Sequence, residues 1–392
     1  MDWTLITVIV LVGAALIFDF TNGFHDAANS VGTVVATRAL PAKWAPAFSA
    51  FFNFLALFVV GTAVASTVAK TVKTEFAGEA VIFSALFAAI AWNYITWNIG
   101  MPSSSSHAII GGLVGAGIAA GGLSAISWGS VEKAAIGIVA SPFVAIVIAF
   151  VAMYIIYLLQ RLFKLHDNHP TFKGLQLVSA AGLSFGHGAN DAQKTMGVIG
   201  ALLLGAGYTS SDGKNIDVPV WVELSAYSAI ALGTLWGGWK IIETMGLKIT
   251  TLHANSGAAA NLGASTAIFG ATAMGAPIST TQAAASSVVG AGIGSGKGAN
   301  WKVVGEMVTA WVLTIPIAAG IAFGMFWLTQ LPVVLAWVVV GAVVVAFGTW
   351  VVNAMRNTVH AADIEAEIPS ERELDEFDTD PVPHLKGEGP VH

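Results

Sequence analysis

Long apolar stretches constrain this 392-residue chain more than any other feature of its sequence. They span, among others, residues 44–66, 80–100, 133–159, 219–239, 303–328 and 333–353. Each stretch reaches the roughly 20 residues that a helix needs to cross the hydrocarbon core of a bilayer. Charged residues make up only 10% of the chain, against about 25% in soluble proteins. We therefore predict an all-α polytopic membrane protein.

Small residues and the N-terminus fit this prediction. The chain has 43 glycines, which destabilise soluble helices but allow close backbone approach between membrane helices. The N-terminus MDWTLITVIV lacks the basic start and the cleavage site of a signal peptide, so its helix is expected to remain in the mature protein. The absence of cysteine excludes disulfides, thiolate metal sites and cysteine nucleophiles.

Acidic charge is concentrated in the C-terminal tail. Residues 357–392 contain ten acidic and two basic residues, whereas the whole chain has a formal charge of −6. The part that precedes the tail is therefore slightly basic. High charge and low hydrophobicity predict that residues 356–392 form a solvated, disordered tail.

A polar motif occurs twice in the otherwise apolar chain. NGFHDAANSVG (22–32) aligns with HGANDAQKTMG (187–197) at a constant offset of 165 residues, which places Asp26 opposite Asp191. A buried carboxylate costs several kcal/mol in hydrocarbon, so both side chains should face the bundle interior. Glycines flank both copies, and they predict an unwound backbone whose amide and carbonyl groups are open to a ligand.

A second motif is also duplicated, in the same order. GMPSSSSHAIIGGLVGAG (100–117) aligns with GAPISTTQAAASSVVGAG (275–292) at an offset of 175 residues. In each copy a proline ends one helix, and a run of hydroxyl residues opens the next. Free amide groups and the helix dipole at such a helix start favour an anion, and hydroxyl groups can donate to it.

The two duplications predict two structural repeats. The polar stretch 161–173 is the predicted linker between repeat 1 (1–160) and repeat 2 (174–330), and an extra membrane helix follows at 331–355. Each repeat should contain a broken first segment, a full span, a span that leads into the hydroxyl-rich stretch, a short Gly-rich helix and a closing span. An odd number of crossings gives inverted-topology repeats with broken or re-entrant helices at the membrane midplane.

Basic residues predict the orientation. Arg38 and Lys43 follow the first segment, and three more basic residues lie in the linker, so both regions are placed inside. The N-terminus is then outside and the tail cytoplasmic, in a multi-pass protein of a cell membrane.

Carboxylates beside an anion site imply a coupling cation. Two aspartates would repel an anionic substrate by several kcal/mol unless cations lie between them or protons neutralise them. The predicted function is therefore cation-coupled anion transport. Sodium is favoured, whereas protons or a metal bound to the anion would satisfy the same electrostatics.

The motifs GFHDAANSVGT and GHGANDAQKTMG, each followed by a Pro-x-Ser-[Ser/Thr]-[Ser/Thr]-[His/Gln] stretch, resemble the inorganic phosphate transporter (PiT) family. The likeness extends over nearly all of residues 1–355. It implies an inverted-repeat fold that carries inorganic phosphate, in many members with sodium, and in bacterial low-affinity members with protons or as a metal-phosphate complex.

One position departs from the family pattern. The family carries Asp-x-x-Asn in both halves, but here only Asp26 and Asn29 keep it, because Lys194 takes the second Asn position. This variant is similar to the bacterial branch of the family, and the resemblance implies a bacterial plasma membrane. A lysine cannot coordinate sodium, so it should pair with Asp191 or with phosphate.

The predicted site residues fall into three groups. The substrate-binding residues are Ser104, Ser105, Ser106, Ser279, Thr280, Thr281, Lys194 and Gly188. The cation-binding residues are Asp26, Asn29, Asp191, Asn190 and Gln282. The candidates for a proton route are His25, His107 and His187. We expect no metal site, because no metal-ligand spacing occurs, and no cofactor other than the coupling ions.

Alternatives to phosphate transport remain at this point. A permease for another tetrahedral oxyanion such as sulfate would use the same hydroxyl groups and helix ends. An intramembrane enzyme is disfavoured, because a nucleophile needs an oriented base and the hydroxyl runs are repeated. Gly-rich faces leave a homodimer open.

Overall fold

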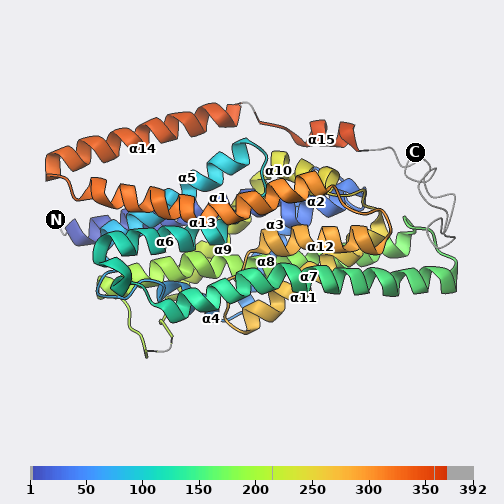
Figure 1. Cartoon of the computed structure of the whole chain (residues 1–392), viewed down its shortest axis with the longest axis horizontal. Coiled ribbons are helices and arrows are strands. Elements are labelled where there is room, and N and C mark those ends of the chain that lie inside the picture. The colour runs from blue at the N-terminus through green and yellow to red at the C-terminus, as the bar shows by residue number, and fades with distance from the viewer. Residues whose placement is uncertain (1–2, 214, 357, 369–392) are drawn as a thin grey trace.

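Long helices that follow one common direction make up the molecule (Figure 1). The computed structural model describes residues 3–213, 215–356 and 358–368. The elements in chain order are α1 (Trp3–Asp26), α2 (Ala28–Ala36), α3 (Ala45–Leu55), η1 (Ala56–Phe58), α4 (Ala63–Ala69), α5 (Glu79–Asn98), α6 (Ser105–Gly121), η2 (Gly122–Ala125), α7 (Trp128–Phe163), α8 (Pro170–Gly205), α9 (Val220–Trp236), α10 (Trp239–Glu243), η3 (Thr244–Lys248), α11 (Ala254–Ala273), α12 (Thr280–Gly294), α13 (Trp301–Thr329), α14 (Val333–Arg356) and α15 (Ala361–Glu367).

Six spans in the described residues are long and apolar enough to cross a membrane. They are the continuous segment Thr4–Ala36, the helices α5, α7, α13 and α14, and α6 with η2. A seventh crossing arises if α3, η1 and α4 count as one bent span. The prediction of an all-α polytopic membrane protein is confirmed.

The apolar stretch 44–66 is bent, whereas the sequence predicted a span. The α3–η1 segment and α4 meet at an angle of 89°. A side chain from α8 stabilises the bend, because Gln193 Oε1 accepts hydrogen bonds from the backbone N–H groups of Val64 (2.9 Å) and Ala65 (3.3 Å). These amides belong to the first turn of α4, where no helical carbonyl is available to them.

The first segments of the two halves are not unwound, which contradicts the prediction. Ala27 alone separates α1 from α2, and its φ of −50° and ψ of −34° are helical. Its N–H donates to the Gly23 carbonyl (3.0 Å), and its own carbonyl accepts from Val31 N–H (3.0 Å). The second copy lies inside the uninterrupted helix α8.

The motif glycines serve helix packing instead. A Cβ atom on Gly23 would lie 2.2 Å from a backbone oxygen of α9, and one on Gly188 would lie 2.3 Å from a backbone oxygen of α3. A Cβ on Gly197 would meet a backbone oxygen of α4 at 2.5 Å. The backbone of each helix therefore approaches its neighbour at a distance that only glycine permits.

The helix breaks occur in the Pro-Ser/Thr stretches, as the sequence predicted. Gly100 and Gly275 follow α5 and α11 with φ of +68° and +64°, a conformation that side chains disfavour. Pro102 and Pro277 come two residues later, and the following helices α6 and α12 begin with hydroxyl residues.

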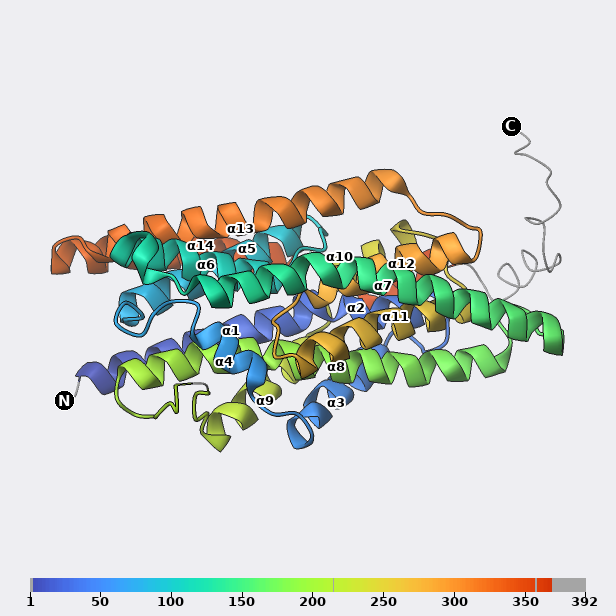
Figure 2. The same ribbon diagram turned by 60° about the horizontal axis from the view of Figure 1, so that its bottom comes forward.

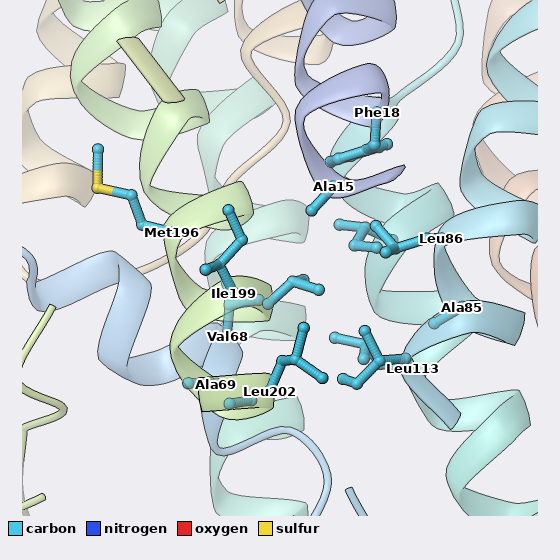
Figure 3. Packing of buried hydrophobic residues seen from close by; sticks show 14 of the residues in the cluster. Ala15, Phe18, Val68, Ala69, Ala85, Leu86, Leu113, Met196, Ile199 and Leu202 are labelled. Carbon is cyan, nitrogen blue, oxygen red and sulfur yellow. The ribbon is translucent and has the colours of Figure 1, made fainter. Parts of the chain in front are cut away.

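Helices from the first and second parts of the chain pack together. α6 lies against α5 and α13, while α12 lies against α11 and α7. α1 contacts α9, and α8 contacts α11, α4 and α3. Figure 3 shows part of the apolar core, in which Phe18 of α1, Leu86 of α5 and Ile199 of α8 lie together.

The beginning of the acidic tail is ordered, so the prediction of disorder for 356–392 is wrong in this part. Residues 361–367 form α15, whose Ile364 is buried. Glu365 accepts a hydrogen bond from the N–H of Ala42 (3.0 Å), and Arg38 donates to the Ile368 carbonyl (2.9 Å). Ile364 and Ile368, four residues apart, give this segment an apolar face. The mostly charged composition of the tail did not indicate it. Residues 369–392 lie outside the described residues.

The linker is shorter than predicted, because α7 extends to Phe163 and α8 begins at Pro170. The start of α1 lies at one end of the bundle, and the α7–α8 connection lies at the other (Figures 1 and 2). α15 lies toward the same end as this connection (Figure 1). The basic residues of the linker and of the loop after α2 are therefore placed toward one end of the bundle, together with α15.

Candidate functional site

The two motif aspartates meet at the start of α12. Asp26 projects from α1 and Asp191 from α8, and the hydroxyl of Thr280 lies between them. Thr280 Oγ1 is 3.3 Å from Asp26 Oδ2 and 3.2 Å from Asp191 Oδ2. All three residues are at most 2% exposed. The duplicated motifs thus contribute to one buried centre, as the sequence predicted.

Asp26 has hydrogen-bonding contacts with hydroxyl groups and with the imidazole of His25. His25 Nδ1 lies 2.7 Å from Asp26 Oδ1, and the other ring nitrogen lies 3.1 Å from the Thr96 hydroxyl on α5. Ser105, the first residue of α6, donates to the same carboxylate oxygen at 3.4 Å. The starts of α6 and α12 therefore both contact this carboxylate.

Asp191 is paired with a lysine from its own helix. Lys194 Nζ lies 2.5 Å from Asp191 Oδ1, and both side chains are fully buried. The same ammonium group donates to the Ser106 hydroxyl on α6. Asn22 of α1 donates to the second carboxylate oxygen at 3.3 Å, and His187 Nε2 lies 3.5 Å from it.

The centre is asymmetric at the position where the motif copies differ. Asn29 occupies the position that corresponds to Lys194, and its amide nitrogen lies 3.5 Å from Thr280 Oγ1 and 3.4 Å from Thr281 Oγ1. Its carbonyl oxygen is buried and has no hydrogen-bond partner among the described residues. An ammonium group balances Asp191, whereas an uncharged amide with a free oxygen stands near Asp26. The Asp26 side is consequently better suited to a small cation.

Ser104 and Ser279 cap the helices that open at the centre. The Ser104 hydroxyl accepts a hydrogen bond from the N–H of His107 (3.2 Å), and the Ser279 hydroxyl accepts from that of Gln282 (3.1 Å). Such caps fix where the first turns of α6 and α12 begin. These two serines were predicted to bind substrate, and the structure gives their hydroxyls a capping role.

Several buried polar atoms near the helix starts have no hydrogen-bond partner among the described residues. They are Ser103 Oγ, His107 Nε2, Gln282 Oε1 and Asn22 Oδ1. Buried polar groups are normally paired, so unpaired groups around one centre indicate a place for a polar ligand. The other ring nitrogen of His107 lies 3.3 Å from the backbone carbonyl of Trp311 on α13.

Two predicted site residues have structural roles instead. Gly188 packs against the backbone of α3, so it is not brought to the centre. Asn190 uses both ends of its amide to hold the chain before α12: it donates to Thr272 Oγ1 (2.9 Å) and the Ala276 carbonyl (3.2 Å), and it accepts from Ile278 N–H (3.3 Å).

Three ligand atoms from two helices could hold a metal ion. One carboxylate oxygen each from Asp26 and Asp191 and one ring nitrogen of His187 lie within 4.8 Å of one another. Sequence spacing could not reveal this group, because the closest pair, His187 and Asp191, supplies only two ligands and the third comes from α1. Asn22 was also missed, although it lies four residues before Asp26 and hence on the same helix face.

Comparison with known proteins assigns a family to this arrangement. The profile of the Phosphate transporter family matches residues 22–322, which include both copies of each motif. The chain belongs to this family.

Curated relatives of the phosphate transporter family share most of the chain. Two of them are described as "Probable low-affinity inorganic phosphate transporter". The protein from Rhizobium meliloti (strain 1021) is 46% identical over 314 residues, which cover 79% of this chain and 92% of the relative. The protein from Bacillus subtilis (strain 168) is 43% identical over 324 residues, which cover 81% and 96%.

A solved structure described as "The sodium-dependent phosphate transporter" has a similar fold. The TM-score is 0.73 at 26% sequence identity, and the match covers 83% of this chain and 99% of that chain. The resemblance that the motifs suggested is confirmed, and the family consists of transporters, so the chain is not an enzyme.

Proposed function

We propose that this phosphate transporter family member carries inorganic phosphate across a bacterial plasma membrane together with a cation, and that sodium is the cation. The proposal rests on one observation. Asp26 and Asp191 both lie within hydrogen-bonding distance of the hydroxyl of Thr280, which is the first residue of α12. A helix start with free amides attracts an anion, and two carboxylates beside it require positive charge.

The charges around the centre support one cation rather than two. A carboxylate and a phosphate oxygen 4 Å apart repel each other by about 4 kcal/mol at an effective dielectric constant of 20. Lys194 already neutralises Asp191 at 2.5 Å, which leaves Asp26 to be balanced. The oxygens of Asp26, Thr280 and Asn29 and the hydroxyl of Ser105 are hard ligands that suit sodium.

Phosphate would bind between the starts of α6 and α12. The hydroxyl groups of Ser105, Ser106 and Thr281 at the two helix starts and the ammonium group of Lys194 on α8 are the donors there. Hydrogen bonds from an ammonium group and helix amides would replace the hydration shell of the anion.

Transport would occur by alternating access of two inverted repeats. The paired helix breaks before α6 and α12 and the interlocked packing of α6 on α13 and α12 on α7 favour this mechanism. The N-terminus would lie outside and α15 inside. The basic linker lies at the same end of the bundle as α15, and basic loops are mostly cytoplasmic. A homodimer and the proton route through His25, His107 and His187 stay predictions.

The test uses the purified full-length chain in liposomes. Labelled phosphate or sulfate is supplied outside, and sodium or proton gradients are imposed one at a time. We expect phosphate to accumulate with a sodium gradient, and accumulation of sulfate but not phosphate would refute the proposal. Asp26→Asn should reduce uptake at least tenfold, since the cation loses a charged carboxylate ligand. Unchanged uptake in both Asp26→Asn and Asp191→Asn would refute the electrostatic argument.

A further inference from the structure

Asp19 is a buried carboxylate that the centre around Asp26 does not use. It lies on α1 and is fully buried, and neither carboxylate oxygen accepts a well-formed hydrogen bond among the described residues. The Thr195 hydroxyl on α8, which is also buried, is the side-chain hydrogen-bonding group nearest to this carboxylate. The buried Tyr227 hydroxyl on α9 has no hydrogen-bond partner among the described residues and is close enough for the charge of Asp19 to act on it.

The antiparallel contact between α1 and α8 explains how these groups meet. Asn22 of α1 donates to Asp191 of α8, which fixes the register of the two helices. Asp19 lies one turn before Asn22, and Thr195 lies one turn after Asp191, so they face each other at the next level of the contact. Asp19 is therefore about 10 Å from Asp26 along α1, on the side of its N-terminus.

The charges that face Asp19 do not neutralise it. The charged groups that act on Asp19 from α8 are Asp191 and Lys194. On α9, Tyr227 faces both Asp19 and Glu223, and Glu223 adds a second negative charge near the Tyr227 hydroxyl. The Lys194 ammonium is bound to Asp191 and to the Ser106 hydroxyl, so its charge is already balanced. Phe18, the residue before Asp19 in the chain, belongs to a buried apolar cluster (Figure 3).

An ionised carboxylate is very unfavourable in such surroundings. Transfer of an isolated carboxylate into an apolar medium costs so much that the group takes up a proton instead. A sodium ion would need more oxygen ligands than one carboxylate and two hydroxyls provide. The surroundings of Asp19 thus favour a proton over a metal ion.

We propose that Asp19, together with the hydroxyls of Thr195 and Tyr227, is a proton-binding site that is loaded in this conformation and unloaded during transport. On unloading, the Oδ–H bond breaks, the proton passes to an entering water molecule, and the bonding electron pair stays on the carboxylate. The two hydroxyls can then donate to the ionised group. The proposal rests on the phosphate transport proposed above and adds a proton to its coupling.

Asp19→Asn tests the proposal, because asparagine has the shape of the protonated acid but releases no proton. The full-length chain is reconstituted with equal sodium on both sides and with the membrane potential held at zero. A pH gradient of one unit, alkaline inside, can accumulate labelled phosphate up to about tenfold per coupled proton. We expect this accumulation in the unmodified chain and a ratio near one in the variant, which should still exchange labelled for unlabelled phosphate.

Asp217→Asn, a change of an exposed loop residue, is the matched control and should accumulate phosphate like the unmodified chain. Equal accumulation by Asp19→Asn and the unmodified chain would overturn the proposal. An unmodified chain that transports no phosphate under any gradient would instead refute the proposed function, so the two failures are distinguishable.

A spectroscopic measurement covers the case in which Asp19→Asn does not fold. Infrared difference spectra of the unmodified chain, recorded between pH values with phosphate bound, should contain the carbonyl stretch of a protonated carboxyl group. Absence of this band overturns the proposal. A rise in melting temperature with sodium, relative to choline, that the folded variant loses would also overturn it, because Asp19 would then bind sodium.

The hydroxyl groups of Tyr227 and Thr195 can be tested through the pH dependence of phosphate accumulation. Tyr227→Phe removes a donor to the ionised form, so proton release should require a more alkaline interior, and the pH of half-maximal accumulation should rise. An unchanged pH profile in both Tyr227→Phe and Thr195→Val would remove these hydroxyls from the site.

Discussion

Replacement of Lys194 by asparagine should create a second cation site. In the unmodified chain the ammonium group lies 2.5 Å from Asp191 and also contacts Ser106. Lys194→Asn would give the second motif the Asp-x-x-Asn pattern that Asp26 and Asn29 form in the first. The variant replaces the ammonium group of lysine by an amide whose oxygen can bind a sodium ion.

The energy of the change follows from the distance. At an effective dielectric constant of 20, two unit charges 2.5 Å apart attract each other by about 7 kcal/mol before desolvation is subtracted. Measured losses on breaking a buried ion pair are about 3–5 kcal/mol, because the remaining charge is left unpaired. We therefore expect the variant to lose about 3–5 kcal/mol of unfolding free energy without sodium. A sodium ion bound at 100 times its Kd restores about 2.7 kcal/mol.

The assay compares thermal unfolding in sodium and in choline. Sodium should raise the melting temperature of Lys194→Asn more than that of the unmodified chain, and phosphate uptake should depend more steeply on sodium concentration. Lys194→Met is the control, since it removes the charge and offers no oxygen ligand. An identical response to sodium in Lys194→Asn and Lys194→Met would refute the reasoning.

Three further predictions concern the helix packing and the helix starts. Gly115→Ala should destabilise the protein by several kcal/mol, because its Cβ would lie 2.1 Å from a backbone oxygen of α13; Gly129→Ala, which meets no atom within 4 Å, should not lower the melting temperature. Ser279→Ala removes the cap of α12 and should cost about 1 kcal/mol and weaken phosphate binding, as measured by melting and by equilibrium binding. Gln193→Leu leaves two amides of α4 without their acceptor and should cost about 1–3 kcal/mol, visible as faster hydrogen exchange in α4.

Local patterns in the sequence predicted much of the fold and the residues at the centre of the site. Apolar length predicted the membrane helices, and the proline-hydroxyl motifs predicted the breaks before α6 and α12. The duplication singled out Asp26, Asp191 and Thr280 before any contact was known. These inferences succeeded because helix length, proline breaks and the burial of charge depend on residues near one another in the chain.

The failed predictions concern interactions between distant residues. Flanking glycines were expected to unwind the Asp motifs, but each glycine contacts a neighbouring helix and the backbone stays helical. The bend between α3 and α4 involves Gln193, which belongs to another helix. Residues 361–367 of the acidic tail form α15, because Ile364 packs on the bundle.

The sequence by itself determined that this chain is a helical membrane protein with two related acidic motifs. Only the tertiary structure decided which groups face those acids. Lys194 pairs with Asp191 through one helical turn, but its second contact, with Ser106, comes from α6. Asp19 looks like one more polar residue of α1 until α8 and α9 enclose its carboxylate, which accepts no well-formed hydrogen bond among the described residues. Burial and electrostatic environment arise from packing in three dimensions, and local sequence does not encode them.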